Sequence, residues 1–197
     1  MKLRLAAGTV ALLASGCATM TAPIQTGDWA ERRAELQTLD DWYLKGRVAV
    51  AAGTEGFSGG LGWEQRGEKA EIELRGPMGG AAILIHVAGV EYVVTDERGR
   101  TYDGEDARQF IEDKFSPGSP LPIVEMRYWL VGAPAPGSPY REIIGEAGSL
   151  AGLEQSGWIV RYDRYRAVGR LALPERLEMT TVGLRLRVAV SDWRFGP

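Results

Sequence analysis

The chain has 197 residues, with 23 Lys and Arg against 26 Asp and Glu, so its formal net charge is −3 at pH 7. This length fits one domain with a substantial core. A mildly acidic chain without a basic block argues against a nucleic-acid partner, whose phosphates need clustered Lys and Arg. No apolar stretch after residue 17 approaches the ~20 residues that a membrane-spanning helix needs.

Residues 1–16 have the organisation of an export signal. A cationic start precedes an apolar run from Leu5 to Ala14, which is too short to span a bilayer. The small pair Ser15-Gly16 then precedes Cys17, the only cysteine. This arrangement resembles a bacterial lipobox, in which the thiol is acylated and becomes the first residue of the mature protein. The alternative is a chance cysteine after an ordinary signal peptide.

The residues that follow Cys17 predict a tether and a location. Residues 18–27 have no apolar period and contain Pro23 and Gly27, which favours a flexible segment between the lipid and a domain spanning residues 28–197. In many Gram-negative lipoproteins an aspartate directly after the lipidated cysteine favours the inner membrane. Here that position is Ala18, so the resemblance implies the periplasmic face of the outer membrane.

From residue 28 the pattern predicts one helix and then mostly strands. Asp28 to Leu39 has the spacing of an amphipathic helix. Two more helical patches begin at Asp103 and at Pro122, and the second is apolar nearly all round up to Val131. Period-two alternation predicts strands over residues 44–52, 57–65, 69–75, 81–87, 91–95, 158–165, 175–182 and 184–193.

These segments predict a mainly β fold with short helices. Short Gly-bearing connections make antiparallel neighbours, and counting ambiguous segments gives roughly nine to eleven strands. An antiparallel sheet of that size tends to curl. We expect the sheet to curl with its apolar face inward and the two helical patches to close one end. It would then form an incomplete barrel over a hydrophobic cavity that is large enough for a ligand.

The chain offers little for catalysis or metal binding. Its one histidine, His86, lies in the most apolar strand, where the favoured interpretation is an ordinary strand residue whose ring nitrogens find local partners. No Gly-x-Ser-x-Gly elbow occurs. The pair Asp40-Asp41 is interpreted as solvated charge. We therefore expect no enzyme activity, no metal and no cofactor.

One apolar residue stands where turn chemistry predicts exposure. Met78 lies at the tip of the turn Gly76-Pro77-Met78-Gly79-Gly80, between two predicted strands, where polar residues are usual. Packing against a neighbouring loop is the plain alternative. Trp42, Trp129 and Trp158 could equally be ordinary core residues.

Several segments form an ordered set along the chain. They are the lipobox ending at Cys17, Trp42-Tyr43-Leu44-Lys45-Gly46-Arg47-Val48, Phe57-Ser58-Gly59-Gly60-Leu61-Gly62-Trp63-Glu64-Gln65, Gly76-Pro77-Met78-Gly79, residues 121–132 (LPIVEMRYWLVG), residues 155–162 (QSGWIVRY), Leu173-Pro174 and Trp193. No single motif is specific, but the ordered set spans nearly all of residues 28–195. Read together, these segments resemble the family of the outer-membrane lipoprotein receptor LolB.

The resemblance implies a fold, a role and a set of partners. The family's fold is an incomplete antiparallel barrel closed by helices over a hydrophobic cavity. Its members take lipoproteins from the soluble periplasmic carrier LolA and place them in the outer membrane. They carry a protruding loop with a bulky apolar tip, a position that Met78 occupies here between Pro77 and Gly79. The implied partners are LolA, the acyl chains of cargo lipoproteins and outer-membrane lipids, and we expect a monomer.

We expect the cavity to be lined by inward-facing apolar side chains from strands and helices. The candidates are Trp63, Leu74, Leu84, Met126, Tyr128, Trp129, Trp158, Leu186 and Val188. Three other functions stay open at this point. One is a cavity-bearing lipoprotein that binds another lipid or a lipid-linked glycan. Another is a structural scaffold lipoprotein with a filled core. The last is an enzyme acting on lipid or peptidoglycan, which would need a nucleophile or a carboxylate pair.

Overall fold

The structure is a computed structural model that describes residues 28–77, 79–80, 82–146 and 148–196. The predicted signal, Cys17, the tether and Met78 lie outside the described residues. The described residues contain eleven strands, three helices and the buried core, so a chain that begins at residue 18 retains this domain.

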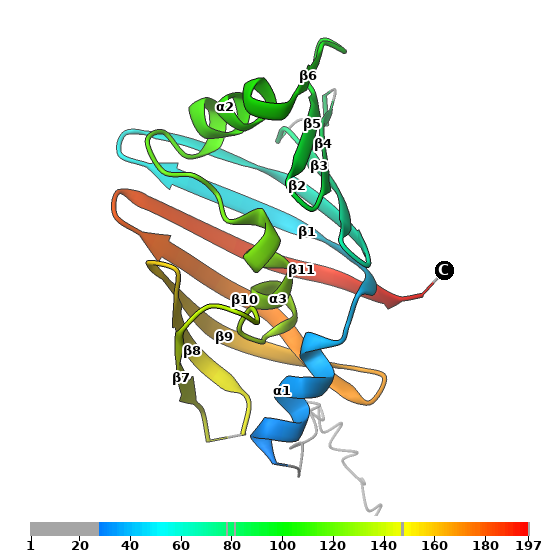
Figure 1. Ribbon diagram of the computed structural model, residues 1–197, viewed down its shortest axis with the longest axis vertical. Coiled ribbons are helices and arrows are strands. Elements are labelled where there is room, and N and C mark those ends of the chain that lie inside the picture. Colours follow the sequence, from blue (N-terminus) through cyan, green and yellow to red (C-terminus); the bar gives the residue numbers. More distant parts are fainter. Residues whose placement is uncertain (1–27, 78, 81, 147, 197) are drawn as a thin grey trace, which may run out of the picture.

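The strands form one antiparallel sheet in the order β6-β5-β4-β3-β2-β1-β11-β10-β9-β8-β7. Their bounds are β1 Asp41–Ala52, β2 Glu55–Arg66, β3 Lys69–Arg75, β4 Ala82–Ala88, β5 Glu91–Thr95, β6 Thr101–Asp103, β7 Tyr140–Ile144, β8 Leu150–Gln155, β9 Trp158–Val168, β10 Leu171–Thr181 and β11 Leu184–Phe195. The sheet curls but does not close, because β6 and β7 remain its two edges (Figure 1). The predicted incomplete barrel is confirmed.

Apolar and polar residues alternate along the strands, so the sheet has one apolar face and one solvent-exposed face. In β11, Leu184, Leu186, Val188 and Val190 are buried while the residues between them are exposed. The same period runs through β1 and β2. The apolar residues of all these strands meet in one core cluster on the concave side of the sheet.

Three helices cover that concave side (Figure 1). They are α1 Trp29–Gln37, α2 Gly104–Phe115 and α3 Ile123–Val131. The carboxylate of Asp28 accepts a hydrogen bond from the N–H of Ala30 and caps α1. Gly132 ends α3 with a φ of 88°, a left-handed conformation that glycine adopts without steric cost. All three helices lie where the sequence predicts them.

The structure extends the sheet beyond the predicted strands. β10 begins at Leu171 and not at Glu175, and residues Leu171 to Pro174 are buried in succession, which hides the strand from a period-two search. The pairing of β10 with β9 shifts register around Arg176, where the alternation resumes. β6 has three residues and β7 is a short edge strand, so neither has a long enough pattern to be placed from sequence.

Candidate functional site: a hydrophobic cavity

A cavity lies between the concave face of the sheet and the helices. Its empty volume is about 580 Å³, including the space open to solvent at its mouth. All the lining side chains are apolar: Val48, Val50, Phe57, Leu61, Trp63, Ile72, Leu74, Ile85, Ile111, Phe115, Leu121, Ile123, Met126, Leu130, Leu186 and Val188.

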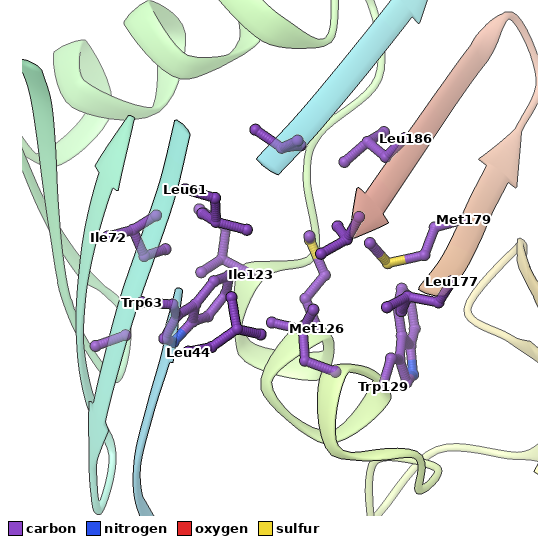
Figure 2. Packing of buried hydrophobic residues seen from close by; sticks show 14 of the residues in the cluster. Leu44, Leu61, Trp63, Ile72, Ile123, Met126, Trp129, Leu177, Met179 and Leu186 are labelled. Carbon is purple, nitrogen blue, oxygen red and sulfur yellow. The ribbon is translucent and has the colours of Figure 1, made fainter. Parts of the chain in front are cut away.

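The sheet and the helices contribute opposite walls of the cavity. Figure 2 shows Ile123 and Met126 of α3 between Leu61 and Trp63 of β2 on one side and Leu186 of β11 on the other. These strand positions face inward because the register of β1 with β2 and with β11 places their buried residues side by side.

The C-terminal end of α2 closes one side of the cavity. Phe115 meets Phe57 of β2 edge to face, with ring centroids 5.3 Å apart and an interplanar angle of 81°. Leu121, in the connection between α2 and α3, continues this wall. The surface that α2 presents to the cavity is therefore apolar, while Lys114 on the same helix pairs with Glu97 outside it.

The polar atom of the wall is directed away from the empty space. Trp63 Nε1 donates to Gln65 Oε1 at 3.0 Å, and Gln65 Nε2 donates to the carbonyl oxygen of Gly67 at 2.8 Å. Trp63 therefore presents only its apolar ring to the cavity. The described side chains of the lining include no titratable group, and the site can bind apolar groups by burial.

The region behind α3 has the opposite character, and we call its central residues Trp129, Gln155 and Tyr162 the polar clamp. Gln155 Oε1 accepts hydrogen bonds from Trp129 Nε1 and from the N–H of Ala135, both at 2.9 Å. The Tyr162 hydroxyl donates to the carbonyl oxygen of Trp129 at 3.0 Å. Burial raises the pKa of Tyr162 well above its ordinary value, so the hydroxyl keeps its proton and remains a donor.

Five of the nine predicted lining residues do line the cavity: Trp63, Leu74, Met126, Leu186 and Val188. Trp129 and Trp158 are buried together behind α3, with ring centroids 6.2 Å apart, and they do not line it. Tyr128 is half-buried under the guanidinium of Arg127, 4.5 Å from the ring centroid, and is also outside the lining.

The predicted inward placement of Leu84 is wrong. Its neighbours Ile83 and Ile85 are buried on the inner face of β4, so the pleat turns Leu84 to the outer face with half-burial. There it lies opposite Glu73 of β3 and Thr95 of β5. Both faces of β4 carry apolar residues, so the sequence pattern does not distinguish the set that contains Leu84 from the set that contains Ile83 and Ile85.

Several lining residues were not among the predicted ones. Val48 and Val50 of β1 and Leu61 of β2 share the alternation that placed Trp63, so the period of two could have found them. Ile111 and Phe115 lie on the buried side of α2. Nothing periodic in the sequence points to Leu121, because it lies in a connection and is placed by the two helices that flank it.

The loop between β3 and β4 is a tight turn. The N–H of Gly79 donates to the carbonyl oxygen of Gly76 at 3.1 Å, and Gly79 has a φ of 70°. Pro77 and Gly79 are exposed. Met78 itself is outside the described residues, so the apolar tip stays a prediction.

His86 lies on the outer face of β4 and not near the cavity. Its Nδ1 is 3.6 Å from Glu71 Oε2 on the neighbouring strand, which agrees with an ordinary strand histidine that has a local partner. Within the part of the chain that the structure describes, no three metal-ligating side chains come together. None of the described helices has the length and apolar character needed to cross a membrane.

Comparison with known proteins gives consistent matches over most of the chain. The model of the family described as Outer membrane lipoprotein LolB matches residues 40–193. The Outer-membrane lipoprotein LolB of Nitrosococcus oceani is 31% identical over 190 residues, which cover 94% of each chain. That of Pseudomonas aeruginosa PAO1 is 36% identical over 201 residues, which cover 98% of this chain and 96% of the relative.

Solved structures share the fold at low sequence identity. A LolA superfamily protein from Nitrosomonas europaea superposes with a TM-score of 0.52 at 13% identity, covering 86% of this chain and 92% of its own. A DUF1329 family protein from Desulfovibrio piger also gives a TM-score of 0.52, at 10% identity, covering 89% and 94%. At these identities the likeness concerns the curled sheet alone.

Proposed function

The chain belongs to the LolB family of outer-membrane lipoproteins, and we propose that its cavity receives the acyl chains of other lipoproteins from the periplasmic carrier LolA, before it inserts them into the outer membrane. The observation that carries this proposal is the cavity, because every side chain that lines it is apolar.

The energetics of an acyl chain explain why such a cavity is needed. Each methylene exposed to water costs about 0.8 kcal/mol. A cargo lipoprotein cannot leave a carrier unless another apolar site accepts its chains as they emerge. A wall such as that around Leu61 and Leu186 can do this by burial alone, so the proposed transfer breaks no covalent bond.

Transfer in one direction requires a tuned affinity. The cavity must hold acyl chains at least as well as the carrier does and less well than the bilayer. Met126 supports such tuning, because its unbranched thioether adapts to irregular contents, and it lies in the centre of the lining. A scaffold role requires only a filled core, so it does not explain this cavity.

Delivery needs contact with the membrane, and we propose that Cys17 and the loop between β3 and β4 provide it. Acylated Cys17 would anchor the chain, since stable anchoring takes at least two acyl chains. The loop Pro77-Met78-Gly79 would touch the lipid interface with an apolar tip on a tight turn, with little conformational entropy to lose.

The transfer step can be tested directly with purified proteins. A chain that begins at residue 18 is mixed with a carrier loaded with lipoprotein, and cargo is followed by separating the two proteins. We expect cargo to move onto this chain. If it stays with the carrier while the chain still binds an apolar dye, the cavity serves another lipid and the proposed function is wrong.

A further inference from the structure

The outer, convex face of the sheet carries a concentration of arginines that the cavity does not use. They project from neighbouring strands β9, β10, β11 and β1, and we call them the convex arginine surface: Arg47, Arg161, Arg164, Arg166, Arg176, Arg185 and Arg187. The carboxylates between them are Asp163, Glu175 and Glu178. This positive excess belongs to a chain whose formal net charge is −3, so charge is unevenly distributed over the molecule.

The centre of this surface is open between two arginines. Arg47 of β1 and Arg176 of β10 both pair in register with Ala189 of β11, one from each side. Two strand spacings, roughly 10 Å, separate their backbones, and only a methyl group stands between them. Ala49 and Ser58 extend this shallow hollow, and Arg187, Asp163 and Glu178 also line it. Small side chains thus let an anionic group approach the sheet between the two guanidinium groups.

The arginines around the hollow divide into paired and available ones. Arg187 Nε lies 2.8 Å from Glu178 Oε2, and this hydrogen bond, against the effect of burial, lowers the pKa of Glu178. Arg164 and Arg166 lie 3.7 and 3.9 Å from the carboxylate of Glu175. Within the described ranges, Arg47 and Arg176 have no ion-pair partner, so their charges are free for an external anion.

The other half of the convex face is different. On β2 and β3, Arg66 pairs with Glu64 and Arg75 with Glu73, while Glu71 lies beside His86. Its charges are largely compensated within the sheet. The positive excess is therefore confined to β9, β10, β11 and β1.

We propose that the convex arginine surface binds the phosphate groups of anionic phospholipids, so that this side of the sheet lies against the bilayer. The planar guanidinium group of arginine can donate two parallel hydrogen bonds to the oxygens of one phosphate. Basic residues near an anionic membrane also contribute favourable binding free energy without a deep pocket. With the convex face on the lipid, the concave side and its cavity point toward the periplasm, where a carrier arrives.

The composition of the surface favours lipid over a protein partner. Protein interfaces depend on buried aromatic and aliphatic anchors at their centre. The exposed large apolar residues on these four strands, Ile159 and Phe195, lie near strand ends and away from Ala189. Headgroup binding needs the charges alone. The inference does not depend on the cavity or on its cargo.

Vesicle binding of the chain that begins at residue 18 tests the inference without the acyl anchor, the carrier or cargo. Sedimentation with phosphatidylcholine vesicles containing about 30% phosphatidylglycerol should show binding that is lost in pure phosphatidylcholine and at high salt. The double variant Arg47→Ala/Arg176→Ala should bind about 30-fold more weakly. The control Lys69→Ala/Arg98→Ala removes the same charge from exposed positions outside this surface and should stay within about threefold of the parent.

Three results would overturn the inference. The first is equal weakening by both double variants. The second is parental binding that is as strong to pure phosphatidylcholine. The third is an Arg47→Ala/Arg176→Ala variant that binds vesicles like the parent but accepts cargo from the carrier more slowly, which would make the surface a protein docking site. The vesicle measurements use neither carrier nor cargo, so their failure is distinguishable from a failure of the transfer test, which uses the parent chain.

Discussion

The two sides of α3 are covered by the same sheet but are built differently. On the side of β1, β2 and β11, apolar side chains face a cavity without a hydrogen bond across it. On the side of β8 and β9, the polar clamp ties Trp129 to Gln155 and Tyr162. Arg127 Nη1 of α3 also donates to the carbonyl oxygen of Gly67 in the β2–β3 turn, at 2.7 Å, so α3 is hydrogen-bonded on both sides. The difference lies in the interior, where the clamp joins buried polar groups while the cavity lining has only apolar contacts.

This division predicts where the fold is vulnerable. Hydrogen bonds specify one geometry, and a buried donor that loses its acceptor costs about 1–3 kcal/mol. Apolar contacts around a cavity accept changes of shape at smaller cost. The clamp should therefore control stability, and the cavity should control binding.

The largest expected effect is on stability, from the clamp. Gln155→Leu leaves the N–H groups of Trp129 and Ala135 buried without their acceptor, so we expect the free energy of unfolding to fall by about 3 kcal/mol. Urea unfolding followed by circular dichroism measures this. Gln109→Leu is the control, because Gln109 bonds Asp113 on the exposed side of α2, and it should change stability by less than about 0.5 kcal/mol. Equal losses would remove the special role of the clamp.

A smaller effect, on binding, comes from a charge introduced into the cavity. Val50 lines the cavity, and its neighbour Ala51 is exposed on the outer face of β1. A carboxylate at position 50 must stay hydrated, so Val50→Glu should weaken the binding of an apolar fluorescent dye about tenfold or more. Ala51→Glu should bind the dye like the parent. Similar losses in both variants, with the fold retained, would mean that the dye does not enter this cavity.

The smallest effect is expected from a change of shape at the centre of the lining. Met126→Leu nearly conserves volume, so the free energy of unfolding should change by less than about 1.5 kcal/mol. Calorimetry or urea unfolding checks this. A loss as large as that of Gln155→Leu would show that the cavity side is packed as specifically as the clamp side.

The sequence predicts the architecture better than the site. Alternation in β11 is clean, so Leu186 and Val188 were placed correctly. β4 is apolar on both faces, and Leu84 was consequently assigned to the wrong one. For α3, all its apolar residues look alike in sequence, yet Met126 faces the cavity and Trp129 faces the clamp. That choice depends on Gln155, a residue far along the chain, whose role no local pattern reveals.

The position of the cargo's acyl chain after transfer decides whether the cavity receives it. A lipoprotein that carries a photoreactive diazirine on one acyl chain is transferred from the carrier to this chain, irradiated, and the labelled residues are mapped by mass spectrometry. If the cavity holds the acyl chain, labels should appear on its wall, at Leu61, Met126 and Leu186. Labels confined to the clamp side around Trp158, or to the outer face of the sheet, would contradict it.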